Sequence, residues 1–217
     1  MKNIIKKQIH SVCRFDREDF LNNNQEINDL MLRILLSHET DNEDFDIQQS
    51  KDFLHNINAD ILTKEFLKVR LYMLLDHKTN TPISFALFSQ DKKREDWHLE
   101  YISTNKEYCG IGYAEKLFMY AAKDIATTKY PYISSVVNED NFASLALHDA
   151  VGNQKGIKLQ SAEMDDADEL YDSYVDDNLD YGDYSQTNGY ANRISFLFDV
   201  SELKSQAELE NDDEIIL

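Results

Sequence analysis

The sequence predicts one α/β domain built on a mixed sheet, with helices on both faces. Segments in which apolar residues alternate as in strands are interspersed with segments whose apolar residues recur at helical spacing. The 217 residues suffice for one domain with additions, or at most two small ones, and no repeat or Gly/Pro-rich linker divides them. Hydrophobic residues make up 42% of the chain, which is typical of a folded globular protein.

The first third of the chain is predicted to form one strand and two helices. Residues 4–12 have the pattern of a strand. Asp16 can cap the helix that follows, because Asp side chains satisfy the free N–H groups of a first turn. The apolar face of that helix consists of Ile27, Leu30, Met31, Ile34 and Leu35. After a polar loop at residues 40–44, the face of a second helix consists of Phe53, Leu54, Ile57 and Ile61.

Three strands are predicted next, at residues 69–75, 83–88 and 97–103. Residues 76–82 include Asp, Asn and Pro, which favour a hairpin loop between the first two of these strands. Simple alternation along the third strand predicts two faces. One face would carry Trp97, Leu99 and Tyr101, and the other His98, Glu100 and Ile102.

The remaining elements alternate between helices and strands. A turn with two glycines leads into a helix whose apolar face consists of Ala114, Leu117, Phe118, Ala121 and Ile125. A strand at residues 132–137 and a short helix at 141–151 follow, and Gly152 suits the C-terminal cap of that helix. Residues 157–159 and 193–200 are the last predicted strands. The predicted order is therefore β, α, α, three strands, α, β, α, β, β.

The charge of the chain is strongly negative and unevenly distributed. The net charge is -19, from 41 acidic and 22 basic residues. Residues 163–183 hold ten acids and no Lys or Arg, and residues 202–217 hold six acids and one Lys, so the rest of the chain is nearly neutral. No basic patch stands out, and nucleic acid is therefore not an expected partner.

The sequence also favours a cytoplasmic location. No run of 18 apolar residues is present, so we expect no membrane-spanning helix. The apolar core of the first nine residues is too short for a signal peptide. The two cysteines, Cys13 and Cys109, are too few for a disulfide framework or a cysteine zinc site and suit a reducing compartment.

The segment Cys109-Gly110-Ile111-Gly112-Tyr113-Ala114 joins a predicted strand to a predicted helix. Glycines let the backbone turn tightly and approach a ligand closely. The N–H groups at the start of a helix, together with the helix dipole, form an anion site that suits phosphate. A Gly-x-Gly sequence is also compatible with a simple tight turn, so the neighbouring residues must decide.

Those neighbours give the turn a family resemblance. Residues 108–118 resemble the acetyl-CoA-binding motif of the GNAT superfamily of N-acetyltransferases, Gln/Arg-x-x-Gly-x-Gly/Ala at the start of a helix. Gly112 and Ala114 match the second half of the motif, and Gly110 fits the glycine that is usual there. Cys109 stands where the family has Gln or Arg.

A second block strengthens the resemblance. The segment from Val137 through Asn141, Ser144 and His148 to Gly152 is similar to the next conserved block of the family, in the correct order and spacing. His148 stands where Tyr is usual, and the residue after Gly152 is Asn153 where Phe is usual. The resemblance covers roughly residues 3–160 and 190–200.

The resemblance implies a GNAT-type fold, in which a mixed, largely antiparallel sheet has two central strands that splay apart at a bulge. It also implies acetyl-CoA as co-substrate, with no metal. The diphosphate would lie on the backbone of the glycine turn, and the pantetheine arm would add to the edge of the 97–103 strand. The implied cofactor-binding residues are Ile102, Ser103, Thr104, Cys109, Gly110, Ile111, Gly112, Tyr113, Ala114, Asn141 and Ser144.

The implied reaction is direct attack of an amine on the thioester, with a base to take the ammonium proton. Glu100 and His98 are the candidate bases, because they share one face of the strand before the turn; Glu100 is alternatively a solvated strand residue. His148 would stand in the position of the acid, or be a surface histidine near the cofactor. Cys109 is either a redox-sensitive nucleophile or a small residue under the phosphate loop.

Residues 163–190 fall in the last strand-to-strand connection, which in this family often lines the acceptor side. They combine the ten acids with Tyr171, Tyr174, Tyr181, Tyr184 and Tyr190. Acids and aromatics suit a cationic acceptor, such as a polyamine, an aminoglycoside-like cation, or a Lys-rich or N-terminal peptide. The alternative is a flexible, solvated insertion.

Residues 1–200 are therefore predicted to form one GNAT-like domain, and residues 201–217 an acidic, disordered tail. The composition of the tail also resembles the Glu-rich C-terminal secretion signals of bacterial type IV effectors, which leaves export by a secretion system as an alternative location. The unusual residues at positions 109, 148 and 153 leave a second function open. In that case the chain is a degenerate GNAT-fold protein that binds a protein partner through its acidic segments.

Overall fold

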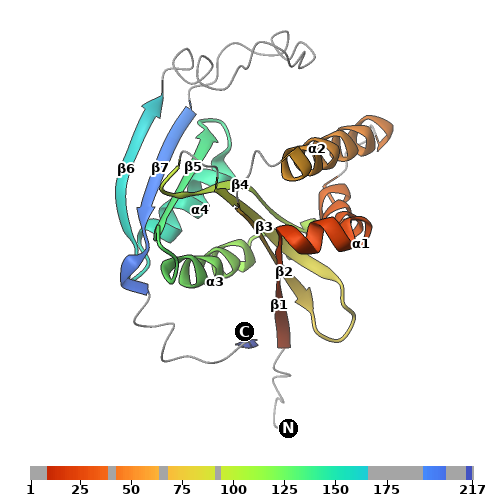
Figure 1. Ribbon diagram of the computed structural model, residues 1–217, viewed down its shortest axis with the longest axis horizontal. Helices are drawn as coiled ribbons and strands as arrows, with labels where there is room; N and C mark the ends of the chain where they lie inside the picture. The colour runs from red at the N-terminus through yellow and green to blue at the C-terminus, as the bar shows by residue number, and fades with distance from the viewer. Residues whose placement is uncertain are drawn as a thin grey trace.

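In the computed structural model, the described strands form a single sheet with helices on both faces (Figure 1). The structure describes residues 9–38, 43–63, 68–90, 94–165, 193–203 and 214–216. The strands are β1 (Ile9–Asp16), β2 (Lys68–Asp76), β3 (Pro82–Gln90), β4 (Trp97–Thr104), β5 (Tyr132–Asn138), β6 (Lys158–Asp165), β7 (Arg193–Asp199) and β8 (Glu214–Ile216). The helices are α1 (Arg17–Leu36), α2 (Glu43–Thr63), α3 (Tyr113–Ala126) and α4 (Phe142–Gly152), with short 3-10 turns η1 (Lys106–Tyr108) and η3 (Ser201–Leu203).

The strands lie in the order β6-β7-β5-β4-β3-β2-β1-β8. Neighbouring strands are antiparallel except β4 and β5, which are parallel. The predicted mixed, largely antiparallel sheet is confirmed, and so is the predicted order of elements from β1 to β7. The predicted strand at residues 4–12 lies instead at Ile9–Asp16, and residues 4–8 are outside the described residues.

The two faces of the sheet bury separate apolar layers. The face covered by α3 and α4 is centred on Phe88, Leu117 and Phe118, and the face covered by α1 and α2 on Ile27, Met31 and Phe85. Figure 1 shows the two helix pairs on opposite sides of the sheet. Because every side chain of β3 is buried, this strand contributes to both layers and forms the centre of the fold.

The start of α1 follows the predicted cap. The carboxylate of Asp19 accepts a hydrogen bond from the backbone N–H of Asp16 at 2.7 Å, and α1 begins at Arg17. Its buried residues include Ile27, Met31 and Ile34, as the helical spacing predicts. A loop is predicted at residues 40–44, but the next helix, α2, already begins at Glu43. The other residues of the predicted loop, 40–42, lie outside the described residues.

A β-bulge in β4 changes which side chains share a face. In the pairing with β3, Leu87 lies opposite Tyr101 and Phe88 opposite Leu99, so Glu100 is the extra residue. Leu99 packs in the layer under α3, whereas the Tyr101 ring stacks on Phe85 in the other layer, with ring centroids 5.7 Å apart. The prediction that Trp97, Leu99 and Tyr101 share one face is therefore wrong at Tyr101, since simple alternation fails at a bulge.

Two predicted details at helix and chain ends are also corrected. Gly152 is the last residue of α4 and not its cap, which is Asn153. A Cβ at Gly152 would lie 3.6 Å from the Phe198 ring, which is an ordinary van der Waals contact. Within the tail predicted to be disordered, Ser201–Leu203 form η3, and Glu214–Ile216 pair with β1 as strand β8. That strand covers the outer edge of β1.

Candidate active site

The parallel strands β4 and β5 open a cleft in the middle of the sheet. Among the described residues they pair only at Trp97 with Ile133 and at His98 with Ser134, and beyond these pairs the strands separate. A cleft of about 710 Å³ follows the gap, between β4, the glycine turn, the start of α3, β5 and α4. The opening is a consequence of the fold, because β4 is held by β3 on one side and β5 by β7 on the other.

Most of the predicted site residues line this cleft. They are Glu100, Ile102, Ser103, Thr104, Cys109, Gly110, Gly112, Tyr113, Ala114, Asn141, Ser144 and His148. Two predicted residues are not part of the lining: His98, and Ile111, whose side chain is exposed at the glycine turn. The residues from β4, the turn and α4 are thus brought together although they are up to 48 positions apart in sequence.

The glycine turn has the geometry of an anion cradle. Gly110 and Gly112 have φ angles of 78° and 83°, a region that favours glycine strongly over residues with a Cβ. A Cβ at either position would meet nothing within 4 Å, so the space above the turn is open. Gly112 also caps the 14-residue helix α3, whose first N–H groups and dipole favour an anion there.

Ser37 and His38, at the end of α1, bind the segment that leads into the glycine turn. The hydroxyl of Ser37 accepts a hydrogen bond from the backbone N–H of Lys106 at 2.9 Å, and His38 Nε2 donates to the Thr104 carbonyl at 2.7 Å. The thiol of Cys109 donates to the Thr104 carbonyl at 3.4 Å. His38 itself lines the cleft, a placement that the sequence alone gave no reason to expect.

Tyr113, the first residue of α3, is tied to β1 by a buried contact. Its hydroxyl lies 3.1 Å from His10 Nε2, and the two rings pack edge to face. Burial lowers the pKa of His10, which favours the neutral ring, and burial raises the pKa of Tyr113. The contact fixes the start of α3 against the sheet, and sequence analysis missed it because the two residues are 103 positions apart.

The bulge places Glu100 at the cleft, with a hydrogen-bond partner on the adjacent strand β3. Ser89 of β3 donates its hydroxyl to the Glu100 carboxylate, and Ser89 is buried. The hydrogen bond holds the carboxylate beside the gap between β4 and β5. A carboxylate at this point is chemically able to accept a proton from a bound amine.

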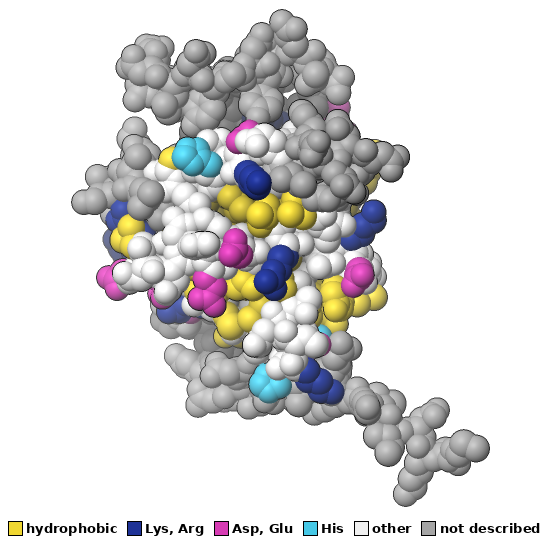
Figure 2. Space-filling view, turned by 90° about the vertical axis from the view of Figure 1, so that its right-hand side faces the viewer, with side chains coloured by type: hydrophobic (Ala, Val, Ile, Leu, Met, Phe, Trp, Pro, Cys, Tyr) yellow, Lys and Arg dark blue, Asp and Glu magenta, His cyan; other side chains and the backbone are white. Residues whose placement is uncertain are grey.

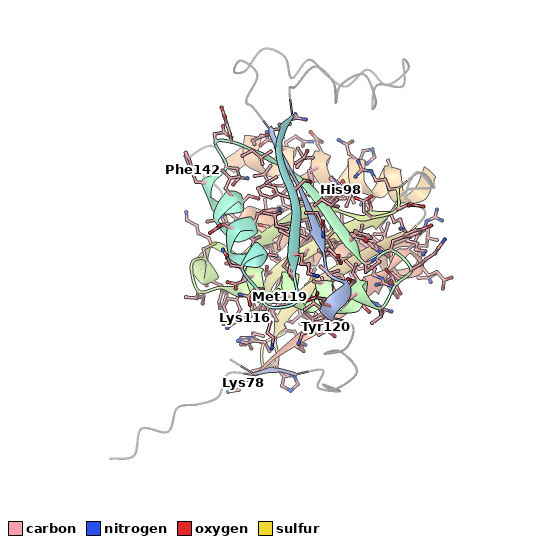
Figure 3. The ribbon with its side chains drawn as sticks, turned by 90° about the vertical axis from the view of Figure 1, so that its left-hand side faces the viewer. Lys78, His98, Lys116, Met119, Tyr120 and Phe142 are labelled. Carbon is pink, nitrogen blue, oxygen red and sulfur yellow. The ribbon has the colours of Figure 1, made fainter. Side chains whose placement is uncertain are left out.

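His98 lies on the same face of β4 as Glu100 but has other partners. Its Nδ1 accepts a hydrogen bond from the Arg94 guanidinium at 3.0 Å and lies 3.0 Å from the Ser134 hydroxyl. His98, which is labelled in Figure 3, is not one of the residues that line the cleft. Because an arginine always donates, it occupies the lone pair that a base would need at this nitrogen.

His148 is buried in the wall of the cleft rather than at the helix surface. Its Nδ1 donates to the Ser144 carbonyl at 2.7 Å, and its Nε2 lies 2.6 Å from the Ser135 hydroxyl. The ring packs on Phe196, with centroids 4.6 Å apart. Burial lowers the pKa of His148, against a smaller opposing effect of the Ser144 carbonyl. The neutral ring therefore carries its proton on Nδ1, and its Nε2 accepts from Ser135.

Sequence analysis missed Ser135, although a signal was present. Ile133 and Val137 are buried on the same face of β5, and alternation places Ser135 between them. A polar residue on an otherwise apolar strand face needs a partner, and His148 is that partner. The predicted cap of α4 is confirmed nearby, since the Asn141 side chain accepts a hydrogen bond from the Ser144 N–H at 3.1 Å.

The described residues contain neither a metal-binding cluster nor a helix that could span a membrane. No group of three or more His, Cys, Asp or Glu side chains there is arranged to hold a metal ion. None of the described helices combines the length and apolar character that a bilayer crossing requires.

Comparison with known proteins identifies one family whose sequence profile matches more than half of the chain. A sequence profile of the acetyltransferase (GNAT) family matches residues 33–152. A GNAT-family protein from Desulfovibrio desulfuricans has a similar structure, with a TM-score of 0.53 and 9% identity over 88% of this chain and 99% of that one. A protein from Acinetobacter baylyi, assigned as an acetyltransferase, gives 0.52 and 11% over 89% and 93%. At these identities the likeness shows the fold alone. A search of curated proteins found no significant match.

Proposed function

Because the chain belongs to the acetyltransferase (GNAT) family, we propose that it transfers an acetyl group from acetyl-CoA to the primary amine of a cationic acceptor. The family match confirms the resemblance found in the sequence. The observation that carries the proposal is the cleft between β4 and β5, which has an anion cradle at one end and a carboxylate at the bulge.

The residues of the cleft fit acetyl-CoA. Gly110 and Gly112 leave open space above a helix N-terminus, which suits the diphosphate. The edge of β4 that faces the gap, from Ile102 to Thr104, suits the amide groups of a pantetheine arm, which can add to it like a strand. Asn141 and Ser144 lie on the opposite wall. When bound, acetyl-CoA supplies the activated acyl group.

Glu100 is the residue best placed to act as base. The acceptor amine attacks the carbonyl carbon of the thioester directly, and Glu100 takes the proton that the nitrogen loses. The hydrogen bond from Ser89 keeps the carboxylate in one orientation, so that no rearrangement is needed before the attack. His98 is not given this role, because Arg94 occupies its Nδ1 and it does not line the cleft.

His148 does not suit the role of direct proton donor. The Ser144 carbonyl holds the proton on Nδ1, and the Nε2 lone pair accepts from Ser135. A neutral ring in this tautomer has no proton to give toward the cleft.

The proposal of a cationic acceptor rests on the charge of the chain. Figure 2 views the face formed by α1 and α2, where acidic and basic side chains are interspersed with apolar ones. The concentrated acidity of residues 163–183 lies almost wholly outside the described residues. Acids and tyrosines in that connection would attract a cationic amine by charge and by cation–π contacts.

Two measurements test the proposal on the full chain. Acetyl-CoA should raise the melting temperature, because a ligand that binds only the folded state stabilises it by mass action. With acetyl-CoA present, spermidine, an aminoglycoside and a Lys-rich peptide should be acetylated, as detected by mass spectrometry. Binding without transfer to any amine in a broad panel would favour the degenerate fold that acts through a protein partner. Absence of binding would overturn the proposal.

A further inference from the structure

Ser135 and His148 form a hydrogen-bonded pair that the direct-attack mechanism does not use. The Ser135 Oγ lies 2.6 Å from His148 Nε2. The other ring nitrogen of His148 donates to a backbone carbonyl at 2.7 Å, which fixes the ring and its tautomer. The Phe196 ring supports the imidazole from one side. A hydroxyl, a neutral imidazole and an acceptor that orients the imidazole are the parts of an activated serine nucleophile.

The pair lies where a molecule in the cleft reaches deepest. The last pairing between β4 and β5 is His98 with Ser134, so Ser135 is the first β5 residue beyond the point where the strands separate. Ser135 and His148 are each only 2% exposed, yet both line the cleft. An acyl-CoA that enters with its diphosphate at the glycine turn and its thioester innermost would bring the acyl carbon to this point. Because both side chains border the open cleft, water can reach them through it when no amine is bound.

We propose that Ser135 and His148 form a second catalytic centre, which takes the acyl group of a bound acyl-CoA as an ester on Ser135 and passes it to water when no amine is present. This rests on the proposed function only in taking acyl-CoA as the occupant of the cleft. Ser135 Oγ bonds to the carbonyl carbon while His148 Nε2 takes the hydroxyl proton. The carbon–sulfur bond breaks, and His148 returns the proton to the thiolate, so that free CoA leaves.

The second half of the reaction restores the serine. A water molecule attacks the ester, and His148 Nε2 takes a proton from that water. The carbon–oxygen bond to Ser135 breaks, the proton passes to Ser135 Oγ, and the free carboxylic acid is released. The net reaction is hydrolysis of the thioester, and it consumes only acyl-CoA and water. Beyond the His98–Ser134 pair β4 and β5 no longer pair with each other, and a backbone N–H group on a facing edge would stabilise the developing oxyanion.

The test uses the full chain with acetyl-CoA and no amine. Release of CoA is measured as free CoA by chromatography, which avoids interference from the two cysteines. Peptide mapping by mass spectrometry measures an acetyl ester on Ser135 that hydroxylamine removes. Ser135→Ala should abolish the ester and reduce CoA release at least tenfold. His148→Gln retains a hydrogen-bond acceptor for Ser135 but no base, and should have a similar effect. Ser134→Ala, one residue earlier on β5, is the matched control and should leave CoA release unchanged.

The outcomes separate this proposal from the proposed function. The acetyl-CoA-induced thermal shift of Ser135→Ala should equal that of the parent, which shows that the variant folds and still binds. If the parent releases no CoA beyond the rate in buffer, or releases it equally fast in Ser135→Ala, then Ser135 only satisfies a buried histidine and this inference is wrong. If acetyl-CoA also fails to shift the parent, the proposed function fails with it.

Discussion

Ser89 donates its hydroxyl to the carboxylate of Glu100 across the β3–β4 pair, at the bulge in β4 that lies beside the cleft. Without the bulge, Glu100 would occupy a regular position opposite β3. As the extra residue of β4, it lies instead beside the gap between β4 and β5. The same irregularity therefore turns Tyr101 to the other layer and leaves a fixed carboxylate beside the opening between β4 and β5.

The first prediction concerns the base. Glu100→Gln should lower kcat about 100-fold, since general base catalysis typically contributes that much or more. His98→Asn should lower kcat less than about tenfold, because His98 is bonded to Arg94 and does not line the cleft. Ser89→Ala should fall between the two while acetyl-CoA affinity is retained. The measurement is a steady-state assay with a saturating amine, and the reverse order of Glu100 and His98 would contradict the assignment.

The second prediction concerns the glycine turn. Gly112→Val should abolish the rise in melting temperature that acetyl-CoA causes. A valine at φ 83° costs about 1–2 kcal/mol in backbone strain, and its side chain would fill the space proposed for the diphosphate. Gly152→Ala is the control, because a Cβ there makes only ordinary contact with Phe198. A full thermal shift in a folded Gly112→Val variant would mean that acetyl-CoA binds elsewhere.

Glu100 and Gly112 also show how much of the site can be predicted from the sequence. The glycine turn and the block from Asn141 to His148 are local motifs, so the sequence alone located these two parts of the cleft lining. The bulge at Glu100 is a property of pairing between strands, and single-strand alternation misplaced Tyr101 for that reason. The contacts of Ser135 with His148 and of His10 with Tyr113 depend on how distant segments pack. Local periodicity contains no signal for such pairs beyond an isolated polar residue on an apolar face.

The third prediction concerns stability, at the carboxylate of Asp124 near the end of α3. It accepts hydrogen bonds from Tyr72 at 2.6 Å, from Arg70 at 3.1 Å and from the partly exposed Arg14 at 3.2 Å. Burial and then the Asp124 charge raise the pKa of Tyr72 well above its ordinary value, so its hydroxyl remains a donor. Asp124→Ala leaves these donors without their acceptor and should cost about 3 kcal/mol of unfolding free energy.

Urea denaturation measures the cost. Tyr72→Phe removes a single hydrogen bond to a charged group and should cost about 2 kcal/mol. Asp29→Ala, at an exposed position of α1, is the control and should stay within about 0.5 kcal/mol of the parent. Equal stability of the parent and Asp124→Ala would show that the cluster does not hold α3 on the sheet.

The fourth prediction concerns acid. Burial lowers the pKa of His148 in the folded chain, so below about pH 6.5 the unfolded chain binds more protons than the folded one. The unfolding free energy should therefore fall as the pH falls through this range, with a slope of up to about 1.4 kcal/mol per pH unit from this residue. Ser135, Ser144, Phe196 and Phe198, which contact the ring, carry no charge that would offset it.

Urea unfolding of His148→Gln between pH 5 and 7 isolates this contribution. The variant should lose the part of the slope that His148 contributes. The part that His10 contributes should remain, because burial also lowers the pKa of His10. His77→Gln, in the exposed hairpin, is the control. A slope in His148→Gln that equals the slope of the parent would mean that His148 is not held neutral by the fold.

The fifth prediction concerns the acidic connection, most of which lies outside the described residues. Residues 163–183 hold ten acids and no base, so they create a local negative field that should concentrate cationic amines. The apparent KM for a polyamine or a Lys-rich peptide should rise with salt, because the Debye length falls from about 10 Å at 0.1 M to roughly 3 Å at 1 M.

Replacing Asp176, Asp177 and Asp180 by Asn should raise the same KM several-fold at low salt. Acetyl-CoA is an anion for which we propose a site at the glycine turn, so its affinity should not fall. A neutral amine is the matched substrate control, and its KM should change little. Unchanged acetylation of cationic amines by the triple variant at low salt would show that the connection is only a solvated loop.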